Sequence, residues 1–263
     1  MTTHTAASTT TLTDLCRGLK LPTVAREAAV LAEQAARQGL GHEEYLLQLL
    51  AAEHEERRLR RAARRTKEAG FPRVKTFEGF DFRRNPSLPE ARLRKLSEGA
   101  YIDRAECVLL VGEPGTGKTH LATALGVAAA EQGRRVRFVT AARLVNELLE
   151  ARDAAELSRV VDRYARVDLL ILDELGYLPL GKVEAELLLQ VLSERAECRA
   201  LVLTTNLPFR EWTSIFPDPR LCRAVIDRLT HRSHIFGTGQ TFIRLQDALN
   251  REGAGLPTQP TDD

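Results

Sequence analysis

The feature that most constrains this 263-residue chain is a glycine-rich segment between an apolar run and a helix-forming stretch. The apolar run spans 107–111, and residues 120–128 have the composition of a helix. The residues between them fit the pattern G-x-x-x-x-G-K-[ST] at every fixed position. They are Gly112, Glu113, Pro114, Gly115, Thr116, Gly117, Lys118 and Thr119. The order strand, loop, helix favours a phosphate-binding loop over a glycine-rich turn that matches by chance.

Each fixed position of this loop has a chemical reason. The glycines allow backbone angles and close approaches that side chains would block, so that successive N–H groups can point at phosphate oxygens. The N-terminus of the following helix adds a partial positive charge at the same place. Lys118 is expected to reach the β- and γ-phosphates of ATP, and the Thr119 hydroxyl to bind Mg²⁺.

The rest of the central region alternates strands with helices. Apolar runs at 136–140, 168–172 and 200–204 predict strands, and amphipathic stretches at 141–151 and 183–196 predict helices. This alternation predicts an α/β fold, with a parallel sheet flanked by helices. Ligands bind at the carboxyl edge of such sheets, so the residues that follow each strand are candidates for the site.

Three polar residues follow the predicted strands. Asp173 and Glu174 come directly after the strand at 168–172: Asp173 is expected to hold Mg²⁺, and Glu174 to polarise the water that attacks the γ-phosphate. Asn206 follows the strand at 200–204, and its uncharged amide could orient that water. Each assignment has a structural alternative: the acids could cap the next helix, and Asn206 could form a turn before Pro208.

A helix predicted near residues 218–229 carries several arginines. One of them could stabilise charge on the transferring phosphoryl group of a neighbouring subunit, and Arg228 is our first choice and Arg223 our second. The alternative is an ordinary ion pair with an exposed acid of the same chain.

The first seventy residues predict a small all-α module, with helical spacing at 12–39, broken at Pro22, and a second helix from 42 to about 70. Between Glu55 and Lys75 there are nine basic residues against three acidic ones. Such a stripe could neutralise phosphates of double-stranded DNA, or it could be a solvated face or pair with an acidic partner. The candidate DNA-binding residues are Arg57, Arg58, Arg60, Arg61, Arg64 and Arg65.

These patterns suggest four segments: a helical module at 1–70, a linker at 71–100, a catalytic core at 101–251 and a disordered tail at 252–263. We expect Phe80 and Phe82 of the linker to pack on the core, although a contact with adenine is an alternative. The four cysteines are widely spaced, which predicts buried free thiols rather than a zinc or disulfide framework. No targeting or membrane-spanning segment is recognisable, so a cytoplasmic location is expected.

With these motifs assembled, the sequence resembles the IstB-like ATP-binding proteins, which are helper ATPases of insertion-sequence transposition in the helicase-loader branch of AAA+ ATPases. The resemblance runs from about Leu19 to Arg244. The segments that carry it are Leu19-Lys20-Leu21-Pro22, Ala69-Gly70-Phe71-Pro72, Gly117-Lys118-Thr119-His120-Leu121-Ala122, residues 170–180 (LILDELGYLPL), residues 206–212 (NLPFREW) and Asp227-Arg228-Leu229. Family members usually end this region with Gly-x-Ser-Tyr-Arg, whereas here Thr241-Phe242-Ile243 precedes Arg244, so no nucleotide-sensing role is assigned to Arg244.

The resemblance implies a helical N-terminal module joined to an AAA+ core. It also implies an ATPase that uses Mg²⁺ and assembles on DNA as a nucleotide-dependent homo-oligomer, which recruits or activates a transposase. It carries nucleotide binding over to residues 112–119, catalysis to Asp173 and Glu174, sensing to Asn206 and the trans-acting arginine to Arg228. The alternatives are a replicative helicase loader, a small-molecule kinase, and a DNA-binding assembly protein that binds ATP without hydrolysing it. No acceptor pocket or arginine-rich lid is apparent for a kinase.

Overall fold

The computed structural model describes residues 12–177, 179–195 and 198–239. The chain divides into two compact units, Met1–Arg64 and Arg65–Asp263. The predicted tail at 252–263 and Arg244 lie outside the described residues.

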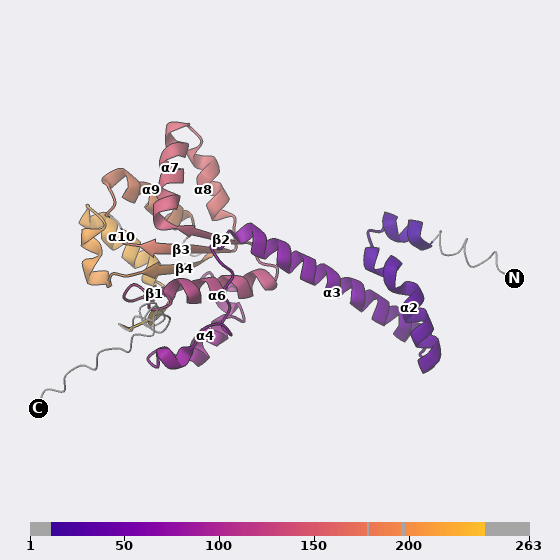
Figure 1. The fold of residues 1–263 in the computed structure, drawn as a ribbon. Coiled ribbons are helices and arrows are strands. Elements are labelled where there is room, and N and C mark those ends of the chain that lie inside the picture. Colours follow the sequence, from indigo (N-terminus) through magenta and orange to yellow (C-terminus); the bar gives the residue numbers. More distant parts are fainter. Residues whose placement is uncertain (1–11, 178, 196–197, 240–263) are drawn as a thin grey trace, which may run out of the picture. The chain divides into compact units, whose positions relative to one another are not determined.

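The second unit is built on a five-stranded sheet whose paired strands are all parallel (Figure 1). The strand order is β2-β3-β4-β1-β5, so β4 lies between β1 and β3. The strands are β1 (Cys107–Val111), β2 (Val136–Thr140), β3 (Leu169–Leu175), β4 (Ala200–Thr205) and β5 (Ser233–Gly237). The predicted parallel α/β core is therefore confirmed, and its central strands are apolar because both of their faces are buried.

Alternate residues of each strand enter two different cores. Val108, Leu110, Ile171 and Val202 belong to a core that includes helix α6 (Lys118–Glu131). Their neighbours Leu109, Leu170, Leu172, Leu201 and Leu203 belong to the opposite core. That core is covered by α7 (Ala141–Asp153), α8 (Leu157–Ala165), α9 (Lys182–Arg195) and α10 (Pro219–Thr230), on the other side of the sheet from α6 (Figure 1). Successive side chains of a strand point to opposite faces of the sheet, and here helices cover both faces. The sheet is thus the middle of three layers.

Several short elements escaped the sequence analysis. They are α8, β5 and the 3₁₀ helix η2 (Phe209–Ser214). Two short helices, α4 (Glu90–Leu96) and α5 (Ala100–Asp103), precede β1. The turn between α7 and α8 contains Ala155 with a φ of 57°. An alanine gives no sequence signal for a left-handed turn, because this conformation usually selects glycine or asparagine.

The predicted linker residues are packed into the second unit. Phe80 and Phe82 are both buried and contact each other edge to face, with ring centroids 4.8 Å apart. They belong to the same core as α6, together with Phe77 and Leu88. A 3₁₀ turn, η1 (Phe82–Arg84), begins there, with Asp81 accepting a hydrogen bond from the Arg83 N–H. These packing contacts hold residues 77–88 against the face of the sheet that α6 covers.

The four cysteines are all free, but their burial differs from the expectation. Cys16 and Cys222 are buried and Cys107 is half-buried, whereas Cys198 is exposed. The prediction of buried thiols is therefore wrong for Cys198, which follows the end of α9. Among the described residues, no helix combines the length and apolarity needed to cross a membrane.

The N-terminal unit contains a helical segment at 12–18, α2 (Pro22–Gln38) and the first part of α3 (His42–Ala69). Pro22 begins α2, and Gly39 ends it with a φ of 66°. The small core of this unit consists of Cys16, Val24, Ala28 and Leu49. Such a small core buries little apolar surface, so polar contacts have more weight in holding α2 against α3.

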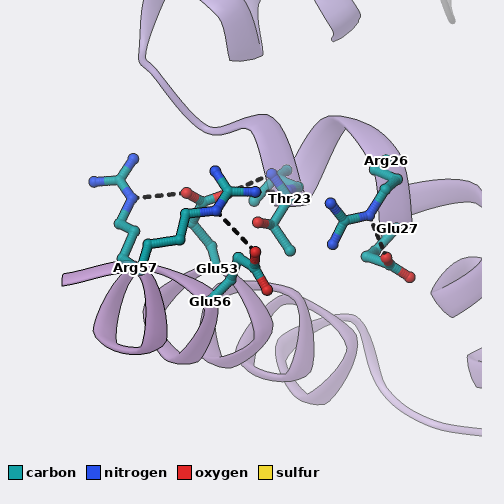
Figure 2. Close-up of polar contacts among 8 residues, drawn as sticks. Thr23, Arg26, Glu27, Glu53, Glu56 and Arg57 are labelled. Carbon is teal, nitrogen blue, oxygen red and sulfur yellow. Dashed lines mark hydrogen bonds and ion pairs between the residues drawn. The ribbon is translucent and has the colours of Figure 1, made fainter. Parts of the chain in front are cut away.

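A buried glutamate of α3 supplies that polar contact. No side chain of α2 caps its N-terminus, but Oε2 of Glu53 accepts hydrogen bonds from the backbone N–H groups of Thr23 and Val24, at 2.7 and 3.1 Å. The other carboxylate oxygen accepts from Nε of Arg57 at 2.7 Å (Figure 2). Arg57 also donates to the carbonyl of Lys20. Glu53 therefore acts as the N-terminal cap of a helix that lies about thirty residues earlier in the sequence.

The pKa of Glu53 reflects this environment. Burial raises the pKa, but the hydrogen bonds from Arg57, Val24 and Thr23 outweigh it, so the net shift is downward. A carboxyl group whose pKa is lower in the folded state stabilises that state at pH values above its unfolded pKa. This contribution is lost as the pH falls through the folded pKa.

We predict that Glu53→Ala destabilises the N-terminal unit by roughly 1–3 kcal/mol, because it leaves buried N–H groups without an acceptor. Amide hydrogen exchange of α2 should accelerate, and the difference from wild type should shrink as the pH falls below about 4. Glu55→Ala, which removes an exposed partner of Arg58 on the same helix, is the control. Equal exchange in the two variants would contradict the capping role.

Candidate functional site

The glycine-rich loop joins β1 to α6 and has a shape that side chains would disturb. Gly117 has a φ of 94°, and a Cβ atom there would lie 2.6 Å from a ring carbon of Phe80. The Phe80 ring also contacts the ring of His120 edge to face, and Nε2 of His120 lies 2.8 Å from the carbonyl oxygen of Thr76. Residues 76–80 therefore pack directly against the loop and the start of α6.

The side chain of Lys118 folds back onto the loop to which it belongs. Its Nζ donates hydrogen bonds to the carbonyl oxygens of Gly112 and Glu113, at 2.6 and 2.8 Å. The side chain is almost fully buried, so this charge is held where the loop closes on itself. An ammonium at this position can exchange carbonyl partners for phosphate oxygens with a small side-chain movement.

A buried pair of threonines connects the loop to the end of β5. Thr116 donates to the carbonyl of Glu113 at 2.9 Å, and its hydroxyl oxygen lies 2.6 Å from that of Thr238. The Thr238 N–H donates to the Val111 carbonyl at 2.8 Å, and its own carbonyl accepts from the Asn85 side chain at 2.5 Å. A Cβ atom on Gly112 would clash with the Thr238 hydroxyl, so this glycine is required by a close approach.

A second hydrogen-bonded group joins the loop to β3 and β4. Oδ1 of Asp173 accepts from the Thr119 hydroxyl at 3.1 Å and from the Thr204 hydroxyl at 2.6 Å. Asp173 is only 3% exposed. The structure thus brings together the two residues for which the sequence predicts metal binding, and adds Thr204, which the sequence analysis did not identify.

The two acids lie in a bulge of β3. Leu172 pairs with Leu203, but the next pair is Leu175 with Thr205, so the register shifts across Asp173 and Glu174. Glu174 has a φ of 62°, and its N–H donates to the Thr204 hydroxyl at 2.8 Å. Its side chain is exposed, whereas that of Asp173 is buried. Such a bulge re-aims a side chain, and a left-handed non-glycine residue is a strained conformation typical of functional sites.

The pKa of Asp173 is raised. Burial is the main cause, and the negative charge of Glu174 adds to it, while the hydrogen bonds from Thr204 and Thr119 and the charge of Lys118 oppose it. A buried carboxylate beside a hydroxyl is a suitable ligand pair for Mg²⁺, which is typically held by one or two protein oxygens and the phosphates. The residues therefore fit the metal that the sequence analysis predicts. In the described part of the chain, no cluster of three or more acidic, histidine or cysteine ligands forms a separate metal site.

The sheet register locates Asn206. The residue before it, Thr205, pairs with Val111 on one side and with Leu175 on the other, and accepts at its carbonyl from the Gly112 N–H at 3.1 Å. Asn206 therefore follows β4 between the start of the loop and the bulge in β3. It is half-buried.

Arg228 lies at the opposite edge of the sheet from the loop. It is exposed, near the end of α10, and borders a cavity together with Cys107 and Leu201, near the beginnings of β1 and β4. The loop follows the other end of β1, about 13 Å away at the usual rise of about 3.3 Å per residue. Within one chain, Arg228 does not join the loop, Asp173 and Glu174. Arg223 is also exposed on α10.

The basic residues of α3 make several ion pairs with acids of the same helix. Arg58 pairs with Glu55, Arg60 with Glu56, and Arg65 with Glu68, at distances between 2.7 and 2.9 Å. Arg57 differs from them, because it is held by the buried Glu53. Arg61 and Arg64 are exposed. The exposed pairs are of the kind that contribute little to stability and can be exchanged for other partners.

We predict that Thr238→Val weakens ATP binding by roughly five- to tenfold, about the free energy of one hydrogen bond. Valine keeps the shape but removes the hydroxyl that contacts Thr116, so the loop loses a buried support. Thr238→Ser, which keeps the hydroxyl, should bind as wild type does. Calorimetric titration with an ATP analogue measures the difference, and equal affinities for Val and Ser would exclude this support.

Comparison with known proteins identifies the family of this chain. A family model described as IstB-like ATP binding protein matches residues 14–251. A putative ATP-binding protein of insertion sequence IS21 from Pseudomonas aeruginosa is 38% identical, over 92% of this chain and 91% of that protein. One from insertion sequence IS5376 of Geobacillus stearothermophilus is also 38% identical, over 91% and 95%.

Two solved structures share the fold of the second unit. The DnaC helicase loader matches with a TM-score of 0.50 and 22% identity, over 56% of this chain and 86% of that chain. The replication initiator DnaA bound to AMPPCP and single-stranded DNA matches with a TM-score of 0.56 and 18% identity, over 72% and 58%. At these identities the likeness shows the AAA+ fold. The family match and the two relatives that are 38% identical show that this chain, an ATPase with the AAA+ fold, belongs to the IstB-like ATP-binding proteins.

Proposed function

We propose that this ATPase assembles on double-stranded DNA as a nucleotide-dependent homo-oligomer, and there recruits or activates a transposase. The observation that carries the proposal is the hydrogen-bonded group of Thr119, Asp173 and Thr204. It places the phosphate-binding loop and the predicted metal ligands beside the strained Glu174, the residue predicted to polarise water, at the carboxyl edge of the sheet. The relatives named for insertion sequences support transposition as the process.

The residues divide the hydrolytic work. The backbone N–H groups of the loop at 112–119, except at Pro114, which has none, and the Lys118 ammonium would bind the phosphates. Thr119 and Asp173 would hold Mg²⁺, which would neutralise charge on the phosphates. Glu174 is exposed next to the buried Asp173, so it is free to polarise a water molecule while Asp173 holds the metal. Asn206, between the loop and the bulge, orients that water. Water rather than a second substrate is then the acceptor.

The position of Arg228 supports a shared site. Because Arg228 lies at the amino edge of the sheet and the loop at the carboxyl edge, Arg228 can act on a nucleotide only when that nucleotide belongs to another copy. ATP at each junction would then stabilise the assembly, and hydrolysis would require two subunits.

The experiment for this function uses Glu174→Gln, with Glu194→Gln on α9 as the control. We expect Glu174→Gln to hydrolyse ATP at least about 100-fold more slowly, the usual effect of losing a general base, while it still binds ATP and assembles on duplex DNA. Mass photometry with and without ATP measures the assembly. The proposal would be overturned if assembly were the same with and without ATP, or if the protein did not bind DNA at low salt. Capture of a replicative helicase in place of a transposase would favour the helicase-loader alternative.

The DNA interface is tested by the basic residues of α3. We predict that replacing Arg60, Arg61 and Arg64 by alanine weakens DNA binding and reduces the slope of log affinity against log salt by about 0.9 for each phosphate that the protein no longer neutralises. Arg57 is left in place because it supports the fold through Glu53. The matched control replaces Arg17, Arg26 and Arg37, which are outside α3. Equal slopes in the two triple variants would place the DNA interface elsewhere.

A further inference from the structure

A cavity of about 280 Å³ at the amino edge of the sheet is lined by an excess of positively charged side chains. It lies among the start of β1, the start of β4 and the ends of α9 and α10. Among the residues that line it, Asp227 is the one acid, against five arginines. These arginines are Arg104, Arg195, Arg199, Arg228 and Arg232.

Arg195 provides the buried part of this charge. It is 2% exposed, and its guanidinium donates to the carbonyl oxygens of Tyr164, Val167 and Ala200, the last at 2.6 Å. Carbonyl groups satisfy N–H donors but carry no net charge, and Nε of Arg195 has no hydrogen-bond partner among the described residues. Burial lowers the pKa of Arg195 to about 10, and the positive charge of Arg199 adds to this shift, while the negative charge of Asp168 opposes it.

The other arginines surround the opening. Arg199 is exposed and lies 3.6 Å from the half-buried Asp168, whose nearer partner is Arg135 at 3.1 Å. Arg228 donates to the carbonyl of Ala224 in its own helix, at 3.3 Å. Arg232 is exposed in the turn between α10 and β5, with a left-handed φ of 56°. Arg104, in contrast, is already neutralised by two hydrogen bonds to Glu106.

We propose that this cavity is a phosphate-binding site, with Arg195 at its base and Arg199, Arg228 and Arg232 at its opening. Guanidinium groups bind phosphate oxygens through pairs of parallel hydrogen bonds, and several of them converge here. At about 280 Å³ the cavity is smaller than the roughly 300–1,000 Å³ of sites for drug-sized ligands, so it suits one or two phosphate groups rather than a whole nucleotide.

Two sources could supply the phosphate. One is free inorganic phosphate or pyrophosphate. The other is the terminal phosphate of ATP bound to a second copy, and this source rests on the proposed function. The nucleotide of the same copy is excluded, because the glycine-rich loop is at the other end of β1. In the second case Arg199 and Arg232 would assist Arg228 in recognising the neighbour's phosphate.

The test uses the full chain with Lys118→Ala, which weakens phosphate binding at the loop, and calorimetric titration with pyrophosphate. We expect binding that falls at least about tenfold when Arg199→Gln and Arg232→Gln are added, since each removes a charge-assisted pair of hydrogen bonds. Adding Arg210→Gln, an exposed arginine of η2 outside the cavity, should leave it unchanged. The melting temperature followed by Trp212 fluorescence checks the fold of each variant. Equal pyrophosphate affinity in the cavity and control variants would overturn the site, whatever the outcome for DNA assembly.

Mixing two variants of the protein identifies the source of the phosphate that the cavity binds. Subunits with Arg199→Gln and Arg232→Gln bind ATP, and subunits with Lys118→Ala keep the cavity. Restored hydrolysis in the mixture supports ATP of a second copy as the ligand. Pyrophosphate binding without such restoration assigns the site to free phosphate. If pyrophosphate binds to the cavity but assembly is the same with and without ATP, the proposed nucleotide-dependent oligomer is rejected. The phosphate-binding site is then retained.

Discussion

The buried carboxylate of Asp173 is the interaction on which the site depends. It accepts from Thr119 in the loop and from Thr204 on β4, and Thr204 in turn accepts from the N–H of Glu174. A buried carboxylate is costly unless hydrogen bonds or a cation compensate it, so the surrounding elements are held in one arrangement. The same group separates the roles of two adjacent acids: Asp173 is buried against the loop, while the bulge turns Glu174 outward. Burial raises the pKa of Asp173 despite the hydrogen bonds from Thr204 and Thr119.

A parallel sheet has two chemically different edges, and this protein uses them differently. The carboxyl edge carries the loop, Asp173 and Asn206, and the amino edge carries the arginine-lined cavity with Arg228. Because all the strands point the same way, one chain cannot bring its own two edges together. The proposed shared site and the proposed phosphate cavity both follow from this separation, and both need a second copy, or a free anion, to be filled.

Much of the core was predictable because its signals are local. The strands at 136–140 and 200–204 and the helix at 42–70 agree with the structure to within a residue at each end. β5 and α8 were missed because both are short. β5 is a half-exposed edge strand, and the turn before α8 uses Ala155 where glycine is usual. Thr204 and Thr238 could not be recognised as supports of the site, since threonine is common in strands and their partners lie far away in sequence. Glu53 escaped notice for the same reason, because its partners are in another helix.

The sequence by itself determined the phosphate-binding loop, the Asp-Glu pair after an apolar strand, the parallel α/β class and the family. These depend on contiguous residues and on periodic patterns, which a chain displays before it folds. Only the tertiary structure decided that β4 separates β1 from β3, that Thr238 contacts Thr116 from the end of β5, and that Arg195 is buried against carbonyl groups. Such features depend on strand order and close packing, which bring together residues whose separation along the chain carries no local signal.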